Sequence, residues 1–233
     1  MNHWRMPLIV ALILIPALPL AAAGILYQYA AAQTPVDLKP GNTQYSDEAR
    51  QIYWRLLGGS EHGIEIRRTD AASYLASVFL LPDFARSTPD IAVLQNASRL
   101  NCGSIVTDRR HGNLLRHLIE FACAIRISHE WTPEQIIDTT LDRAGYGRDA
   151  TSLSTAAMAY YGKDIEALTS AQLLALLVLT HGYSFLDPDC HPERFARHYH
   201  LLAQRGGFAG DDMTLDAALQ DMQRTPCSKP STH

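Results

Sequence analysis

The residue best placed to do acid–base chemistry is Glu120, which stands among apolar neighbours with two basic side chains just before it. Arg116 and His117 precede Glu120 by four and three residues, and side chains at these separations share one face of a helix. An ion pair with Arg116 would favour the ionised carboxylate. The same spacing is also typical of a helix-surface salt bridge worth about 0.5 kcal/mol or less, and without further information this plainer interpretation is preferred.

A second set of reactive side chains surrounds Cys190, where three histidines follow: His191, His198 and His200. Their spacing fits no short zinc-ligand signature, so packing and surface roles are favoured and no metal site is predicted. The four cysteines allow three pairings in an oxidising compartment: Cys102, Cys123, Cys190 and Cys227. A bridge between Cys190 and Cys227 would fix the C-terminal tail, but the sequence does not select one pairing.

Length and composition allow one modest domain with accessory segments. The chain has 233 residues, 47% of them apolar, which is enough to bury a sizeable core. Its formal net charge is -4 and no stretch is rich in Lys or Arg. Nucleic acid is therefore excluded as a partner, because no basic stripe is present to displace counterions from phosphates.

Residues 1–32 are expected to form an N-terminal membrane anchor. Residues 7–26 carry no charge, and a helix of that length spans a hydrocarbon core of roughly 30 Å. His3 and Arg5 lie ahead of this run and no cation follows closely, which favours a cytoplasmic N-terminus and a single-pass protein. The alternative is a cleaved signal peptide with a cleavage site before Gln33; the length of the run favours the retained anchor.

The rest of the chain is expected to be mainly α-helical. Residues 33–46 read as a linker, residues 47–205 as the helical domain, and residues 206–233 as a short helix near 214–222 with a flexible tail. Helices are expected over 47–57, 70–81, 114–129 and 173–179.

Four side chains mark where helices begin or end. Ser46 and Thr169 are candidate N-caps, Thr132 is followed by Pro133 and a capping box with Gln135, and Pro82 ends the helix before it.

Arg116-His117-Leu118-Ile119-Glu120, Leu141-Asp142-Arg143 and Tyr160-Tyr161-Gly162-Lys163 follow one another in this order. Together with the rest of residues 102–202 they resemble the motifs of the peptidoglycan glycosyltransferases of family 51. The segment Arg116-His117-Leu118-Ile119-Glu120 resembles the family's Arg-Lys-x-x-Glu motif, with His117 in the lysine position. Residues 141–163 run without a gap beside the family's Leu-Asn-Arg-x-x-Phe-Gly…Ala-Ala…Tyr-Phe-Gly-Lys pattern. The identical positions are Leu141, Arg143, Gly147, Arg148, Ala150, Ala156, Ala157, Tyr160, Gly162 and Lys163.

The first part of the family pattern matches less well. Gly103-Ser104 and Val106-Thr107 resemble its Gly-Gly-Ser-Thr-Ile-Thr-Gln-Gln motif with several replacements. The upstream motif Glu-Asp-x-x-Phe-x-x-His-x-Gly is not matched. If Phe84 is its phenylalanine, then Leu80 stands where the catalytic glutamate belongs.

The resemblance implies a lysozyme-like helical fold and a site for a sugar pyrophosphate. It implies that Glu120 is a catalytic acid and that the substrate is held by six residues: Ser104, Thr107, Arg116, His117, Arg126 and Arg143. A divalent cation, Mg or Mn, could accompany the pyrophosphate. Asp83 is the nearest acid able to replace the missing base, with Glu61 and Glu65 more remote.

Three functions follow from the resemblance. The first is a glycosyltransferase of cell-wall biogenesis that acts on or binds the lipid-linked disaccharide pyrophosphate, with catalysis reduced or lost. The second is a non-catalytic partner of a cell-envelope synthase, and the third a lysozyme-like glycan-cleaving enzyme, which needs two carboxylates. The implied location is the bacterial inner membrane, with the body in the periplasm.

Overall fold

The computed structural model describes residues 24–75, 88–103, 112–208 and 213–227. Within these ranges the protein is mainly helical and no strand is present; an isolated bridge joins Gly147 and Ala150. Residues 24–32 are helical. The longer helices that follow are α2 (Asp47–Leu56), α5 (Pro89–Cys102), α6 (Gly112–Glu130), α7 (Pro133–Arg143), α8 (Leu153–Tyr161), α9 (Ser170–Leu179) and α11 (Pro192–Arg205). The short ones are α3 (Ala71–Leu75), the 3-10 helix η4 (Ile165–Ala167), α10 (Tyr183–Leu186) and α12 (Leu215–Leu219).

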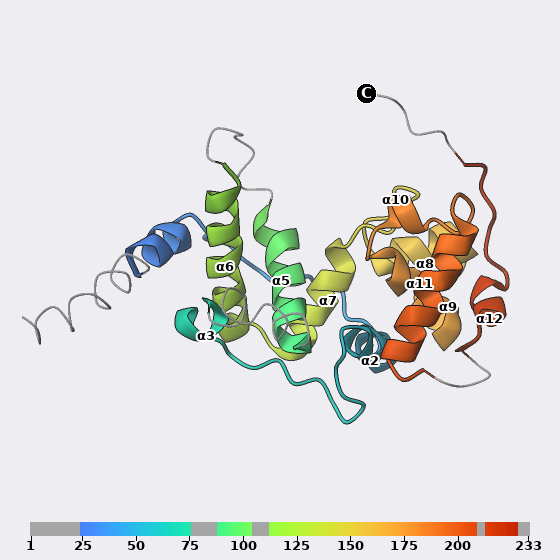
Figure 1. The fold of residues 1–233 in the computed structure, drawn as a ribbon, viewed down its shortest axis with the longest axis horizontal. Coiled ribbons are helices and arrows are strands. Elements are labelled where there is room, and N and C mark those ends of the chain that lie inside the picture. Colours follow the sequence, from blue (N-terminus) through green and yellow to red (C-terminus); the bar gives the residue numbers. More distant parts are fainter. Residues whose placement is uncertain (1–23, 76–87, 104–111, 209–212, 228–233) are drawn as a thin grey trace, which may run out of the picture.

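The helices form two groups that α7 joins (Figure 1). In the first group α5 packs against α6 and α7, and α3 packs against α6. In the second, α9 packs against α2, α8, α11 and α12. Every residue from Ala171 to Leu179 is buried, as expected for the uninterrupted apolar run, so α9 is the centre of the larger core.

The helix starts lie where the polar side chains predict them. Ser46 accepts a hydrogen bond from the Ala49 amide, and Thr132 and Thr169 each form a reciprocal capping box with the residue three positions on. Such caps satisfy amides that have no partner within the helix and stabilise it by about 1 kcal/mol each. Thr214 likewise caps α12, which ends at Leu219, before the expected boundary.

Helix α5 is the main element that the sequence interpretation missed. No helix is predicted over residues 89–102, yet they form a helix of 14 residues with Pro89 in its first turn. Its buried face carries Val93, Leu94 and Ala97. Polar residues interrupt the apolar periodicity of this segment, which explains why the pattern is weak.

Two disulfides select one of the three possible pairings. Cys102 of α5 bonds to Cys123 of α6, and Cys190 bonds to Cys227. The first bridge joins α5 to α6, the helix that carries Glu120. The second attaches the C-terminal segment to the body. This Cys190–Cys227 bond is the pairing considered above as a way to fix the C-terminal tail.

Part of the expected N-terminal anchor lies outside the described residues. In the helices that the structure does describe, none is long and apolar enough to cross a bilayer. The helix over 24–32 exposes Ile25, Leu26 and Tyr29. The expected helix over 70–81 is described only as α3, and its remaining residues also fall outside the described ranges.

Candidate functional site

Glu120 lies on α6 and faces α5, with its side chain only 15% exposed. Its Oε1 atom is 3.7 Å from Nε of Arg116, and its Oε2 atom is 3.3 Å from Nδ1 of His117. The contact with Arg116 is longer than a hydrogen bond, and Arg116 Nε is buried without a hydrogen-bond partner among the described residues. The Arg116 guanidinium and the Glu120 carboxylate therefore attract each other, and each can still form a hydrogen bond with another group.

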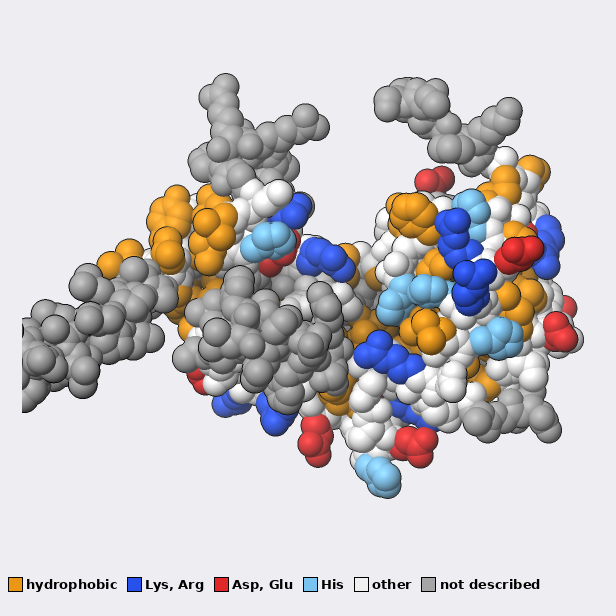
Figure 2. Space-filling view, in the orientation of Figure 1, with side chains coloured by type: hydrophobic (Ala, Val, Ile, Leu, Met, Phe, Trp, Pro, Cys, Tyr) orange, Lys and Arg blue, Asp and Glu red, His pale blue; other side chains and the backbone are white. Residues whose placement is uncertain are grey.

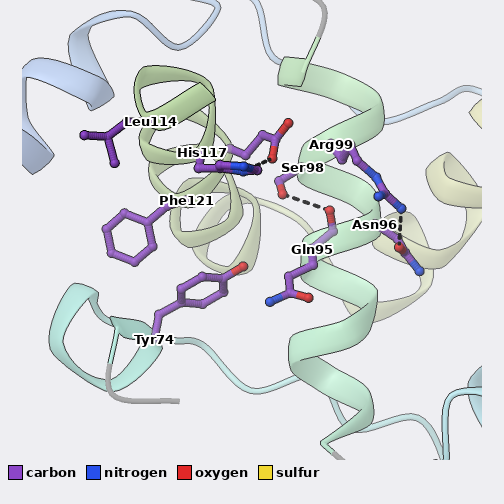
Figure 3. A pocket seen from close by; sticks show the side chains of 9 residues that line it. Tyr74, Gln95, Asn96, Ser98, Arg99, Leu114, His117 and Phe121 are labelled. Carbon is purple, nitrogen blue, oxygen red and sulfur yellow. Dashed lines mark hydrogen bonds and ion pairs between the residues drawn. The ribbon is translucent and has the colours of Figure 1, made fainter. Parts of the chain in front are cut away.

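A pocket of about 460 Å³ opens beside this carboxylate (Figure 3). Helices α5 and α6 form its walls, and α3 contributes one aromatic ring. The lining residues are Tyr74, Gln95, Asn96, Ser98, Arg99, Leu114, His117, Glu120 and Phe121. The predicted acid is thus turned into a concavity and not into bulk solvent.

The pocket has two chemically different sides. Leu114, Phe121 and the ring of Tyr74 form an apolar side, whereas Gln95 and Ser98 project from α5 toward His117 (Figure 3). Arg99 leaves α5 on the other side and bonds to Asn96. Leu114 is 72% exposed, so the apolar side reaches the surface. An amphiphilic ligand fits such a site, because one end meets hydrocarbon and the other meets donors and charge.

The polar residues of α5 were not among the predicted site residues. Gln95, Ser98 and Arg99 are separated by three and four residues, which is the spacing that places side chains on one helix face. This regular polar spacing was the signal available in the sequence, but it is informative only once residues 89–102 are known to be helical.

Gly103 ends α5 immediately beside the carboxylate. A Cβ atom at this position would lie 3.2 Å from Glu120 Oε1, closer than a carbon and an oxygen normally approach. Because residue 103 is a glycine, the Glu120 side chain has room in its present position.

Two predicted substrate-binding arginines contact other parts of the protein. Arg126 pairs with Glu130 at 2.8 Å and donates to the Pro35 carbonyl at 2.6 Å, so it holds the linker against α6. Arg143 contacts Asn101 and the Lys39 carbonyl. Neither residue lines the pocket; the structure brings Arg116, His117 and Glu120 together and places these two elsewhere.

The other predicted site residues divide into two sets. Asp83, Ser104 and Thr107 lie outside the described residues, as does Leu80. Glu61 pairs with Arg55 at 2.9 Å, and 66% of its side chain is exposed, which agrees with its interpretation as part of a polar loop.

Glu120 is the sole carboxylate among the described residues that line the pocket. Burial raises the pKa of the Tyr74 hydroxyl, which a hydrogen bond with Gln95 partly offsets, so Tyr74 stays protonated at neutral pH. No cluster of three His, Cys, Asp or Glu side chains occurs within the described ranges. Glu120 alone would suit Mg²⁺ held mainly by ligand phosphates, since that ion commonly takes one or two protein carboxylates.

Basic and imidazole side chains border the hollow between the two helix groups (Figure 2). This local enrichment contrasts with the formal net charge of -4 for the whole chain. An anionic ligand would be attracted to this face in particular, because fields are strengthened in clefts lined by one sign of charge.

Comparison with known proteins agrees with the geometry. Residues 100–206 match the family model described as Transglycosylase. The chain is 34% identical over 92 residues to penicillin-binding protein 1A of Mycobacterium tuberculosis, which is 39% of this chain and 11% of that protein. It is 32% identical over 111 residues to penicillin-binding protein 1A of Rickettsia felis, covering 47% of this chain and 14% of that protein.

These similarities support a family 51 transglycosylase-like region within residues 100–206. The chain spans only a small part of the length of these relatives, between 11% and 14%. The matched region includes α6 to α11 and the end of α5, and hence Arg116, His117 and Glu120.

Proposed function

We propose that this protein is a peptidoglycan glycosyltransferase-like component of cell-wall biogenesis that binds the lipid-linked disaccharide pyrophosphate, with catalysis reduced or lost. The observation that carries the proposal is the pocket beside Glu120, with an apolar side next to a cationic and hydrogen-bonding one. A polyprenyl pyrophosphate has the same two parts, a hydrocarbon tail and a strongly anionic head.

The reaction of this family places two demands on the protein. A sugar hydroxyl must lose a proton as it attacks the anomeric carbon, and the pyrophosphate must leave with added negative charge. Arg116 suits the second demand, since a guanidinium forms strong charge-assisted hydrogen bonds with phosphate oxygens. Its side chain is 43% exposed and lies 3.7 Å from Glu120, which lines the pocket, although Arg116 itself is not among the described lining residues.

The first demand needs a general base, which typically contributes about 10² to 10⁴ in rate. With Phe84 aligned to the phenylalanine of the family's first motif, Leu80 stands in the position of the catalytic glutamate, and a leucine side chain accepts no proton. Glu120 lies beside Arg116 and His117, but by resemblance it belongs to the donor side of the reaction. Substrate binding is therefore expected to persist while the rate of polymerisation falls.

The proposed location is the periplasmic face of the bacterial inner membrane. The uncharged run of residues 7–26 continues into the helix over 24–32, whose Ile25, Leu26 and Tyr29 are exposed. Exposed apolar and aromatic side chains at the end of such a run suit a membrane interface. This placement would bring the pocket near the membrane that holds the lipid tail.

A polymerisation assay tests the catalytic half of the proposal. The purified full chain, supplied with lipid-linked disaccharide pyrophosphate in detergent, is expected to make little or no glycan polymer when products are separated by gel electrophoresis. An active family 51 enzyme in the same assay is the positive control. Processive glycan synthesis by this chain that Glu120→Gln abolishes would show that catalysis is retained and would overturn this half.

A further inference from the structure

The Cys102–Cys123 disulfide joins the two walls of the Glu120 pocket close to the carboxylate. Cys102 is the last residue of α5, and Cys123 lies three residues after Glu120 on α6. Both cysteines are fully buried. Cys102 is followed by Gly103, where a Cβ atom would come within 3.2 Å of Glu120 Oε1. The bond therefore fixes the end of α5 to α6 immediately beside Glu120.

Hydrogen bonds tie α5 to helices other than α6. Asn96 Nδ2 donates to Tyr53 Oη of α2 at 3.0 Å, and Asn101 accepts a hydrogen bond from Arg143 of α7. These contacts lie on either side of the residues that α5 contributes to the pocket, so the position of α5 follows that of α2 and α7.

Helix α6 is tied to a different part of the chain. Ser128 Oγ accepts from the Thr69 amide at 3.2 Å, and Arg126 holds the linker through the Pro35 carbonyl. The ring of Phe121 lies edge-on to the ring of Tyr27, with 5.9 Å between their centroids. The position of α6 thus follows that of the linker and of the helix over 24–32.

The two walls of the pocket therefore belong to separate sets of contacts, which apolar packing and the disulfide join. Packed helices slide past each other by about 1–2 Å at low cost, and a covalent link at one end of α5 opposes that motion. A site held in its binding geometry before the ligand arrives binds more tightly, because less ordering accompanies binding.

We propose that Cys102 and Cys123 are positioning residues of the Glu120 pocket, and that ligand binding is coupled to the oxidation state of this pair. The inference rests on the proposed function for the nature of the ligand. With the bond formed, Gln95 and Ser98 of α5 are held toward His117 (Figure 3).

Reduction of the bond by a dithiol releases this constraint. The dithiol gives up two electrons and two protons and becomes a disulfide, while the S–S bond of the protein breaks and each cysteine becomes a thiol. Helix α5 then moves more freely on α6, and the pocket binds its ligand more weakly.

The first test is calorimetric titration of Cys102→Ala/Cys123→Ala with farnesyl pyrophosphate. The double variant removes the bond without adding a polar group to the core, and it is expected to bind about five- to tenfold more weakly than the native chain, at the low end of coupling between sites. Cys102→Ala/Cys123→Val, which refills the space of the second sulfur, takes its place if circular dichroism shows that the first variant is unfolded.

Cys190→Ser/Cys227→Ser is the matched control. Its cysteines are 37 residues apart, compared with 21 for the other pair, so loss of loop-closure entropy predicts at least as large a fall in the unfolding midpoint. The C-terminal segment stays attached through Arg224 and Thr225, which bond to Asp189. This control should bind farnesyl pyrophosphate with the affinity of the native chain.

The coupling also predicts an effect of the ligand on the disulfide. In Cys190→Ser/Cys227→Ser the pair at 102 and 123 is the remaining one of the four cysteines. This variant is equilibrated with mixtures of reduced and oxidised dithiothreitol until the thiol fraction, measured by alkylation and mass spectrometry, is constant. Saturating farnesyl pyrophosphate should lower the equilibrium constant for reduction by the same five- to tenfold, because coupling is reciprocal.

Equal affinities of the Cys102→Ala/Cys123→Ala variant and its control, or a reduction equilibrium that bound ligand leaves unchanged, would refute the coupling. Absence of binding to the native chain would count against the proposed function instead. Amide hydrogen exchange then decides the positioning role without a ligand. Exchange at Ser98, Gly103 and Glu120 should be faster in Cys102→Ala/Cys123→Ala than in the control, and equal rates would refute it.

Discussion

Glu120 shows how the surroundings of one side chain decide its role. An Arg116–Glu120 pair four residues apart is ordinarily a surface salt bridge. The residue types and spacing alone gave no reason to prefer a functional role for Glu120. The structure leaves the carboxylate 15% exposed and 3.7 Å from the guanidinium, which is neither a tight ion pair nor a solvated one. Glu120 also lines a pocket, and this position is what makes a ligand-binding role the better explanation.

Gly103→Ala tests the dependence of the site on the position of Glu120. The Gly103 backbone is right-handed helical, with φ of -66° and ψ of -25°, so alanine is compatible with it and the 3.2 Å approach to Glu120 Oε1 is the main perturbation. The affinity for farnesyl pyrophosphate, measured by calorimetry, is expected to change by severalfold. The free energy of unfolding should fall by about 1 kcal/mol or less, at the low end for added core atoms.

Gly24→Ala is the control for that change, because no atom of the described residues lies within 4 Å of a Cβ at residue 24. It should leave the affinity unchanged. If Gly103→Ala behaves like Gly24→Ala in the binding measurement, the position of Glu120 is not a determinant of ligand affinity.

At the scale of helices, the chain was most predictable where local chemistry alone sets the boundary. Thr132 and Thr169 form the expected capping boxes, since a cap depends on residues only a few positions apart. Helix α5 was missed because its stability depends on packing against α6 and α7, which the residues of α5 do not encode by themselves. For the same reason, the polar residues of α5 that line the pocket were not predicted.

The C-terminal segment is held by a buried ionic contact as well as by the Cys190–Cys227 bond. Arg148 pairs with Asp189 at 2.7 Å, and their side chains are 10% and 8% exposed. Arg224 and Thr225 of the C-terminal segment also bond to this carboxylate. The contact links residues 148, 189 and 224, which lie in three separate segments.

Asp189→Asn should destabilise the protein by about 3 kcal/mol, because it leaves the buried Arg148 without its charged partner. Denaturant unfolding followed by circular dichroism measures this loss. Asp216→Asn, on the first turn of α12 and in an exposed position, is the control and should change stability far less.

The loss of stability caused by Asp189→Asn is expected to depend on pH. Burial raises the pKa of Asp189, but hydrogen bonds from Thr225 and Arg224 and the charge of Arg148 outweigh it, so the pKa is lowered below its usual value. The stabilisation is fully present above about pH 4, the usual pKa of the unfolded carboxyl, and is lost as the pH falls through the lowered pKa. The stability difference between the native chain and Asp189→Asn should therefore shrink below about pH 4; a difference constant down to pH 2 would contradict the assignment.

At the scale of the molecule, the sequence predicted the mainly helical class and the family, whereas the arrangement of the site required coordinates. Motif order between residues 102 and 202 carried the family resemblance, and the match over residues 100–206 agrees with it. Arg126 and Arg143 could not be placed, because their partners are the linker residues Pro35 and Lys39 and the unpredicted helix α5. The Glu120 pocket depends on the packing of α3 and α5 against α6, which are separate segments of the chain.

Binding of a lipid-linked pyrophosphate in the Glu120 pocket is tested most directly by calorimetric titration of the full chain with farnesyl pyrophosphate. The native chain should bind saturably, and Arg116→Gln should weaken binding by about tenfold through loss of a charge-assisted hydrogen bond. Arg197→Gln removes an exposed arginine from α11 and should leave the affinity unchanged. Absence of saturable binding, or equal affinities of the Arg116→Gln and Arg197→Gln variants, would contradict the account.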